Sequence, residues 1–139
     1  MNLTQILSLK DFNKVIFGGE KVELDAALLK KVEESFLFLK KFSESKVIYG
    51  VNTGFGPMAQ YRISDADKLQ LQYNLIRSHA SGTGKPLSPS AAKAVMLARL
   101  NTLCLGNSGV HPSVVVLLKE LINRNITPLI FEHGGVGAS

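Results

Sequence analysis

The sequence predicts a mainly α-helical chain with a few short strands, and three observations support this. Apolar residues recur at helical spacing in several segments, capping residues precede those segments, and glycine-rich loops separate them. With 139 residues, of which 45% are hydrophobic, the chain is long and apolar enough to bury a core. No internal repeat or long linker divides it. We therefore expect residues 1–139 to form one unit.

The first third of the chain predicts two helices with a short strand between them. Ser8 is placed to cap a short helix that Gly18-Gly19 would end. Residues 22–24 alternate apolar and charged side chains, which suits a short strand or extended segment. Asp25 can cap a longer helix with one apolar stripe, which should end near residues 42–43.

The middle of the chain predicts a β-prone stretch, a helix and a loop. Residues 46–51 are β-prone and run into the glycine-rich segment 52–57. Ser64 or Asp65 begins an amphipathic helix that continues to Ser78-His79. Residues 80–89 contain two glycines and two prolines, so we expect a loop there.

The last third predicts two further helices. Residues 90–105 are apolar nearly all round, which is typical of a helix buried on most sides. Arg99 lies within that segment, and a buried guanidinium needs a partner. Pro112 fits the first turn of another helix, with its apolar residues on one side.

The charge of the chain does not predict a nucleic-acid site. The net charge is +5 and the pI about 9.4. The longest basic runs are only the pairs Lys30-Lys31 and Lys40-Lys41, and both have glutamates nearby. Solvated helix faces explain such pairs better than a phosphate track does. We expect no nucleic-acid partner.

The cysteine and histidine content predicts neither a disulfide nor a metal site. Cys104 is the single cysteine, and it lies in an apolar run that suits a buried thiol. The three histidines show no metal-ligand spacing with it. No segment has the roughly 18 apolar residues that a membrane span needs, so we expect a cytoplasmic chain with no membrane partner.

One glycine loop, Gly82-Thr-Gly-Lys85, invites a nucleotide-binding interpretation. A P-loop needs a glycine five positions before the glycine of the Gly-Lys pair, and a serine or threonine directly after the lysine. Those places hold His79 and Pro86. Proline also removes a backbone donor where donors would cradle phosphate. A nucleotide site is therefore not expected.

Four motifs in order resemble those of the aromatic amino acid ammonia-lyases of the histidine and tyrosine type. They are Tyr49-Gly-Val-Asn-Thr-Gly-Phe-Gly56, Asn74-Leu-Ile-Arg-Ser-His-Ala-Ser-Gly-Thr-Gly84, Arg99-Leu-Asn-Thr-Leu followed by Gly106-Asn-Ser-Gly-Val110, and Gly134-Gly-Val-Gly-Ala-Ser139. The resemblance implies the N-terminal portion of the fumarase/aspartase-like helical lyase fold. It covers essentially the whole chain, which would then be an incomplete fold.

The last motif implies a prosthetic group. In the family that the chain resembles, an Ala-Ser-Gly tripeptide cyclises and loses water to give a methylidene-imidazolone. Ala138 and Ser139 would supply two of its residues, and a following glycine, not present in this chain, would supply the third. Three explanations for the stop at Ser139 remain open: a cloning boundary, cleavage at the Ser-Gly position, and an enzyme in separate pieces. The last two are favoured.

The resemblance also implies roles for individual residues. Tyr49 would be the base that takes the β-proton. A free phenol is mostly protonated at neutral pH, so backbone N–H groups of residues 54–56 are expected to stabilise its anion. Ser78 and His79 would contact the substrate side chain, with Gly56 against the substrate and Asn107 lining the same region. Arg99 would be a structural ion-pair member.

The implied reaction is the non-oxidative elimination of ammonia from histidine, giving urocanate, or from tyrosine, giving p-coumarate. Ser78-His79 matches the histidine lyases, whereas the wording of residues 54–61 and 132–136 is closer to bacterial tyrosine lyases. The substrate stays open between the two. An aminomutase with the same prosthetic group and a non-catalytic lyase-like binding module are the alternatives. The family implies a homotetramer completed by the remainder of the lyase polypeptide, so the isolated chain should be inactive.

Overall fold

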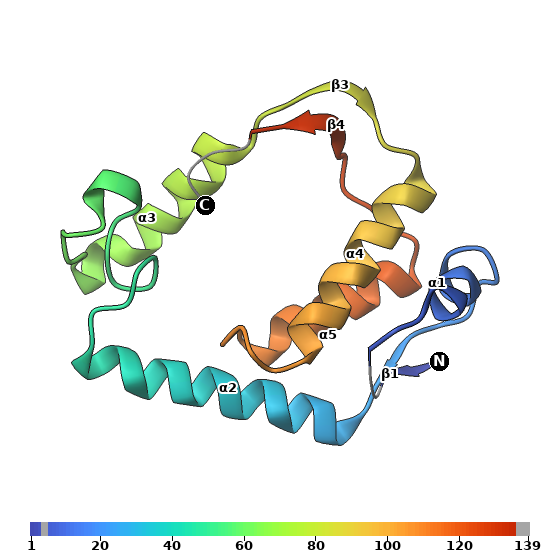
Figure 1. Ribbon diagram of the computed structural model, residues 1–139, viewed down its shortest axis with the longest axis horizontal. Helices are drawn as coiled ribbons and strands as arrows, with labels where there is room; N and C mark the ends of the chain where they lie inside the picture. Colours follow the sequence, from blue (N-terminus) through green and yellow to red (C-terminus); the bar gives the residue numbers. More distant parts are fainter. Residues whose placement is uncertain (4–5, 136–139) are drawn as a thin grey trace. The chain divides into compact units, whose positions relative to one another are not determined.

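A computed structural model describes residues 1–3 and 6–135, with only the backbone of Asp65. The elements, drawn in Figure 1, are β1 (Asn2–Leu3), α1 (Leu9–Ile16), β2 (Glu23–Leu24), α2 (Ala26–Ser45), the 3-10 helix η1 (Gly56–Met58), α3 (Asp65–His79), β3 (Gly82–Pro86), α4 (Pro89–Cys104), α5 (Pro112–Asn123) and β4 (Phe131–Gly134). They divide into two compact units. The first comprises Met1–Lys40 and Pro86–Ile130, and the second comprises Lys41–Lys85 and the residues from Phe131 onward.

The first unit holds the hydrophobic core. Helix α4 packs against α5 and α1, and the short strands β1 and β2 pair in parallel with Leu3 opposite Leu24. The fully or nearly fully buried apolar side chains are Leu3, Val15, Val22, Val32, Ala92, Met96, Leu97, Leu100, Leu103, Cys104, Val115 and Ile122. Most of α4 is buried or half-buried, as predicted, and Val95, Ala98 and Arg99 lie in a single exposed stripe along it.

Local capping explains where the helices of the first unit begin. Ser8 and Asp11 form a reciprocal capping box at the start of α1. The Asp25 carboxylate accepts the N–H of Ala27 at 2.8 Å, as the sequence predicted. Helix α4 starts at Pro89 because Ser88 caps it by accepting the N–H of Ala91 at 3.2 Å. His111 caps α5, whose first residue is Pro112.

The buried cation of the first unit is Lys93, not Arg99. The sequence predicted that Arg99 is buried and therefore needs a partner. This is wrong, because Arg99 is exposed. Lys93 is 8% exposed, and its Nζ donates to the Val15 carbonyl at 3.0 Å and to Asn125 Oδ1 at 2.8 Å. Val15 lies in the last turn of α1, where helix carbonyls lack partners within the helix and favour positive charge. Lys93 thus connects α1 to the turn after α5.

The second unit consists of a loop closed on itself, helix α3 and a two-stranded sheet. Residues 46–51 form no strand, because 46–48 are irregular and 49–52 form a turn, so the predicted β-prone stretch is wrong there. A bridge between Thr53 and Arg62 closes the following loop, which contains η1. Ser64 caps α3, as predicted. Residues 82–86, predicted as loop, form β3, which pairs with β4.

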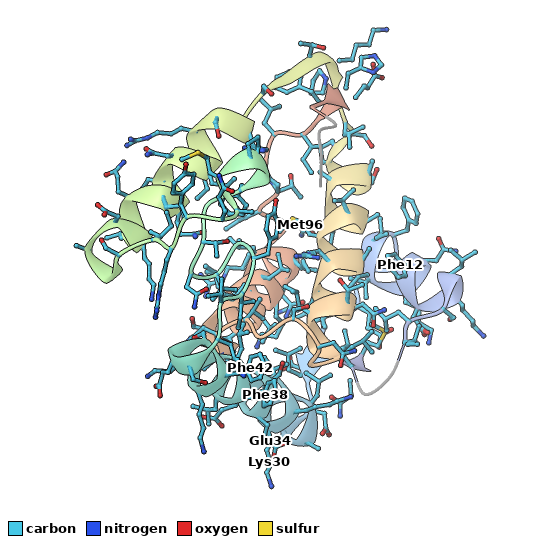
Figure 2. All side chains as sticks on the ribbon, turned by 60° about the vertical axis from the view of Figure 1, so that its left-hand side comes forward. Phe12, Lys30, Glu34, Phe38, Phe42 and Met96 are labelled. Atoms are coloured by element: carbon cyan, nitrogen blue, oxygen red, sulfur yellow. The ribbon has the colours of Figure 1, made fainter. Side chains whose placement is uncertain are left out.

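The lysine pairs of α2 lie on solvated surface, as the sequence predicted. Lys30, Lys31, Lys40 and Lys41 are all exposed. Lys30 Nζ lies 4.0 Å from Glu34 Oε1 one turn later, and Figure 2 shows the two side chains on one side of the helix. Such an exposed pair contributes little to stability. In the described part of the chain, no helix combines the length and apolar character that crossing a membrane requires.

Candidate active site

The side chain of Tyr49 is anchored by the loop that follows it. Its phenol oxygen Oη accepts the backbone N–H of Gly56 at 3.0 Å. The ring meets Phe55 edge to face, with centroids 5.9 Å apart and planes at 89°. Tyr49 is 56% exposed, so its oxygen is held in place while remaining accessible. One of the backbone N–H groups expected to face the phenol therefore does so.

Two buried polar residues hold the Tyr49 loop, and sequence reasoning assigned them no role. Asn52 is 2% exposed. Its amide nitrogen donates to the carbonyls of Ser43 and Lys46 at 3.0 and 2.7 Å, and its oxygen accepts the N–H of Ile48 at 2.8 Å. Thr53 Oγ1 accepts the N–H of Gly50 at 3.2 Å. Short polar residues between glycines were the available signal, because such residues bond to nearby backbone.

Two glycines of the loop are required by its geometry. Gly56 has φ +54°, a left-handed conformation that other residues adopt at a cost. A Cβ on Gly54 would lie 2.6 Å from the carbonyl oxygen of Met58, so a side chain there would push η1 away. The N–H that reaches Tyr49 is thus presented by a backbone that only glycine adopts freely.

A pocket of about 370 Å³ lies between this loop and helix α3. Its walls are mainly apolar, and the polar residues Asn74, Ser78 and His79 are among those that line it. Its lining residues are Gly54, Phe55, Met58, Ile63, Leu71, Asn74, Leu75, Ser78 and His79. The second unit therefore brings the predicted substrate residues Ser78 and His79 to the loop that carries Tyr49 and Gly56. An apolar pocket with a few polar groups is typical of small-molecule sites.

His79 ends helix α3, and its ring is oriented by the last turn of the helix. Its Nδ1 lies 3.0 Å from the Leu75 carbonyl oxygen and 2.9 Å from Ser78 Oγ. Ser78 Oγ in turn donates to the same carbonyl at 3.0 Å. The Ser78 hydroxyl is therefore engaged by its own helix, although sequence reasoning predicted that it contacts substrate.

Of the two glycines at the end of β4, Gly135 lies near Ser81, which follows α3. A Cβ on Gly135 would lie 3.6 Å from Ser81 Oγ, and Ser81 donates its N–H to the His79 carbonyl at 2.8 Å. A Cβ on Gly134 would meet nothing within 4 Å, so this backbone is open on that side. The predicted residues Ala138 and Ser139 lie outside the described residues. Asn107 belongs to the first unit, where it is exposed in the turn between α4 and α5.

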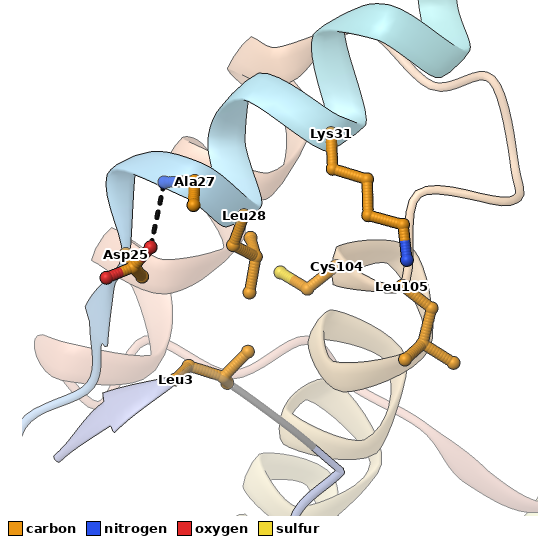
Figure 3. Close-up of a pocket in the computed structure, with 7 residues that line it drawn as sticks. All are labelled: Leu3, Asp25, Ala27, Leu28, Lys31, Cys104 and Leu105. Atoms are coloured by element: carbon orange, nitrogen blue, oxygen red, sulfur yellow. Dashed lines mark hydrogen bonds between the residues drawn. The ribbon is translucent and has the colours of Figure 1, made fainter.

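A second pocket, of about 240 Å³, lies in the first unit between the start of α2 and the end of α4. Figure 3 shows Cys104 and Leu28 in it, with Lys31 along one side. Burial raises the pKa of the Cys104 thiol to about 11, which disfavours the nucleophilic thiolate. No group of three or more metal-ligating side chains occurs within residues 1–3 and 6–135.

Both the sequence and the fold of the chain are similar to those of known proteins. The family model for aromatic amino acid lyases matches residues 7–139. The histidine ammonia-lyase of Streptococcus gordonii is 45% identical over 134 residues, which are 96% of this chain and 26% of that protein. That of Streptococcus pyogenes serotype M5 is 42% identical over the same shares. The chain thus spans about a quarter of the length of these relatives.

Solved structures give the same picture of the fold. The tyrosine aminomutase of Streptomyces globisporus matches with a TM-score of 0.89 and 32% identity, over 97% of this chain and 26% of that one. The histidine ammonia-lyase of Trypanosoma cruzi matches with a TM-score of 0.83 and 27% identity, over 97% and 27%. The predicted fold class, a mainly α helical-lyase fold with a few short strands, is confirmed. The chain belongs to the aromatic amino acid lyase family.

Proposed function

We propose that the chain contributes to an enzyme that eliminates ammonia from histidine or tyrosine without oxidation. The observation that carries the proposal is the 3.0 Å hydrogen bond from the Gly56 N–H to Tyr49 Oη, in a loop whose other residues line the His79 pocket. It joins a candidate base to a candidate side-chain pocket within one compact unit. The similarity to histidine ammonia-lyases supports the reaction class.

Tyr49 is proposed to take the proton from the substrate β-carbon. In the elimination the Cβ–H and Cα–N bonds break, a Cα=Cβ double bond forms, and ammonia departs. The proton passes to Tyr49 Oη, and the Gly56 N–H donor stabilises negative charge on that oxygen before the transfer. Because Tyr49 is packed against Phe55, the oxygen approaches the substrate from a defined direction.

Ala138 and Ser139 are proposed to hold the methylidene-imidazolone together with a following glycine. When present, that group supplies an electrophilic alkene that makes the substrate amine a better leaving group. Gly134 and Gly135, which lead into this segment, have room around them, since a Cβ would meet nothing within 4 Å at Gly134 and only Ser81 Oγ at 3.6 Å at Gly135. The residues described here then bind the side chain and move the proton.

His79 is proposed to contact the substrate side chain at the wall of the pocket. Both candidate side chains, an imidazole and a phenol, carry a polar hydrogen that an imidazole nitrogen accepts. The apolar lining, including Phe55, Met58 and Leu71, suits the faces of an aromatic ring. Gly56 would lie beside the substrate, and Asn107 is proposed for the same region.

A complete enzyme is proposed to need polypeptide beyond these residues and the homotetramer of the family. The histidine ammonia-lyase of Streptococcus gordonii, of which this chain covers 26%, is about four times as long. We therefore expect the isolated 139-residue chain to be inactive. Turnover of histidine or tyrosine by it alone would contradict the shared active site.

The test uses the full natural gene product. Its intact mass shows whether residues follow Ser139 and whether water has been lost. The purified protein is then incubated with histidine and with tyrosine while urocanate and p-coumarate absorbance are followed. Tyr49→Phe should lower kcat/KM by roughly 10²- to 10⁴-fold, the usual range for a lost acid–base group. Tyr61→Phe, a similarly exposed tyrosine of the same segment, is the matched control.

An aminomutase is the second candidate, because two aminomutases are among the similar structures. One is the tyrosine enzyme already described, and another is the phenylalanine aminomutase of Pantoea agglomerans, with a TM-score of 0.88 and 32% identity. Such an enzyme would return the amino group to the β-carbon. Chromatography of the same reactions for a β-amino acid product separates the two candidates. Absence of any product from either amino acid would reject both.

A further inference from the structure

We infer that the last turn of α3 fixes the neutral His79 ring as the tautomer with hydrogen on Nδ1, leaving Nε2 as an acceptor. Which nitrogen of a neutral histidine carries the hydrogen is decided by the hydrogen bond that each nitrogen makes. Here Nδ1 faces the Leu75 carbonyl oxygen at 3.0 Å.

A carbonyl oxygen can only accept, so an Nδ1 lone pair facing it would be repelled. The second neighbour of Nδ1 gives the same answer. Ser78 Oγ donates its own hydrogen to the Leu75 carbonyl at 3.0 Å, and so presents a lone pair to Nδ1 at 2.9 Å. Both neighbours of the nitrogen are acceptors. Nδ1 is therefore the donor, and Nε2 carries the lone pair.

His111 in the same chain has the opposite arrangement and serves as an internal reference. The backbone N–H of Ser113 points at its Nδ1 at 3.2 Å, where it caps helix α5. A backbone N–H can only donate, so Nδ1 of His111 must hold a lone pair and its hydrogen lies on Nε2. One chain therefore contains both tautomers, each set by a helix end.

This assignment makes Ser78 a positioning residue rather than a substrate contact. Its hydroxyl connects the Leu75 carbonyl to the His79 ring, so it acts on the ring and not on a ligand. With a lone pair on Nε2, His79 can accept a hydrogen bond from a substrate side chain that carries a polar hydrogen. It has no hydrogen on Nε2 to donate to a side chain that can only accept. This selection of substrate side chains rests on the proposed function, whereas the assignment of the His79 tautomer does not.

The test is nitrogen-15 NMR of the histidine side chains in the full chain, at roughly pH 8.5, where an ordinary imidazole is neutral. Two-bond correlations to the ring protons distinguish the protonated from the unprotonated nitrogen. His79→Gln and His111→Asn variants assign the signals. We expect the protonated nitrogen to be Nδ1 in His79 and Nε2 in His111. His111 also reports that the α5 cap has formed in the sample.

A protonated Nε2 in His79, with His111 as expected, would overturn the assignment. Ser78→Ala removes one of the two acceptors, so its His79 signals should move toward an average of the two tautomers, and Ser78→Thr should restore them. Unchanged His79 signals in Ser78→Ala would show that Ser78 does not position the His79 ring. The Leu75 carbonyl alone would then set the ring.

Kinetics of the full gene product separate this inference from the proposed function. If both hold, Ser78→Ala should raise KM roughly tenfold, the factor that about 1.4 kcal/mol of binding represents, with a smaller change in kcat. Ser78→Thr should recover most of it. An inactive enzyme with the expected tautomers would sink the proposed function and leave the tautomer assignment standing.

Discussion

Tyr49 and Gly56 are seven residues apart and are joined by a hydrogen bond from the backbone N–H of the glycine to the phenol oxygen of the tyrosine, at 3.0 Å. The contact closes a loop whose interior is filled by polar side chains, because Asn52 and Thr53 are both buried. The loop therefore positions its tyrosine through backbone geometry. Substitutions within the loop should act on Tyr49 without touching it.

Replacing Gly56 tests the backbone geometry directly. Gly56→Ala has space for its methyl group, but the φ of +54° costs a non-glycine residue roughly 1–2 kcal/mol. We expect lower stability and a weakened Tyr49 hydrogen bond, measured by urea unfolding and by the phenol ultraviolet spectrum. Gly56→Asn is the matched control, since asparagine tolerates this conformation better. Equal loss in both variants would mean that side-chain bulk, not φ, decides the effect.

Asn52 is expected to be the most sensitive polar residue of the loop. Asn52→Leu removes the hydrogen bonds that Asn52 makes with the Ile48 N–H and with the Ser43 and Lys46 carbonyls. The expected loss in the free energy of unfolding is about 2–4 kcal/mol, from three hydrogen bonds at roughly 1 kcal/mol each and the burial of unpaired groups. Gln72→Leu, at an exposed position of α3, should change stability by less than about 0.5 kcal/mol. Similar effects of the two changes would contradict the anchoring role.

The elements that the sequence predicted well are those whose signals are local. Ser8, Asp25 and Ser64 each cap a helix by bonding to a backbone N–H two or three residues on, so the pattern of neighbours was sufficient. Strand β3 was missed because its partner β4 begins about 45 residues later, and pairing at that distance leaves no local pattern. Residues 46–51 are rich in β-formers, yet they form no strand, and the Asn52 side chain bonds to the backbone of Lys46 and Ile48 instead.

The candidate site divides in the same way. The sequence motifs indicated four site residues that all lie in the second unit: Tyr49, Gly56, Ser78 and His79. The sequence did not show that the Ser78 hydroxyl bonds to its own helix, because the direction of a hydroxyl depends on the helix turn beneath it and not on its neighbours in sequence. Lys93 was overlooked for a similar reason. Its acceptors, Val15 and Asn125, lie 78 and 32 residues away.

Lys93 is expected to stabilise the first unit. Lys93→Met keeps the apolar stem but leaves the Val15 carbonyl and Asn125 Oδ1 without a donor, which costs about 1–3 kcal/mol. Asn125, with φ 56°, also loses the bond that holds its side chain. Thermal unfolding of the variant should show a lower midpoint than Lys10→Met, a change at an exposed lysine of α1. A midpoint equal to that of the control would mean that burial of the ammonium offsets its hydrogen bonds.

Because the Cys104 thiol is buried, we expect the free energy of unfolding to decrease at alkaline pH. Its pKa is raised from 9.0 to about 11 by burial, so the folded state holds the proton more tightly than the unfolded state. The stabilising contribution is complete below about pH 9 and is lost as the pH rises through about 11. Across this pH window, the free energy of unfolding measured by denaturant titration should decrease by on the order of 2 kcal/mol more in the wild type than in Cys104→Ala. Parallel curves would reject the burial of the thiol.

The pairing of β3 with β4 has a consequence for the order of assembly during synthesis. Both strands flank the segment that forms α4 and α5, so the glycine run near Gly134 reaches Ser81 only after that whole hairpin of helices has been made. Closing so long a loop is entropically costly until the helices inside it have shortened the distance. Ribosomal release of residues 131–134 would therefore be the event that lets this sheet form, and pauses in translation before this point would leave β3 without its partner strand.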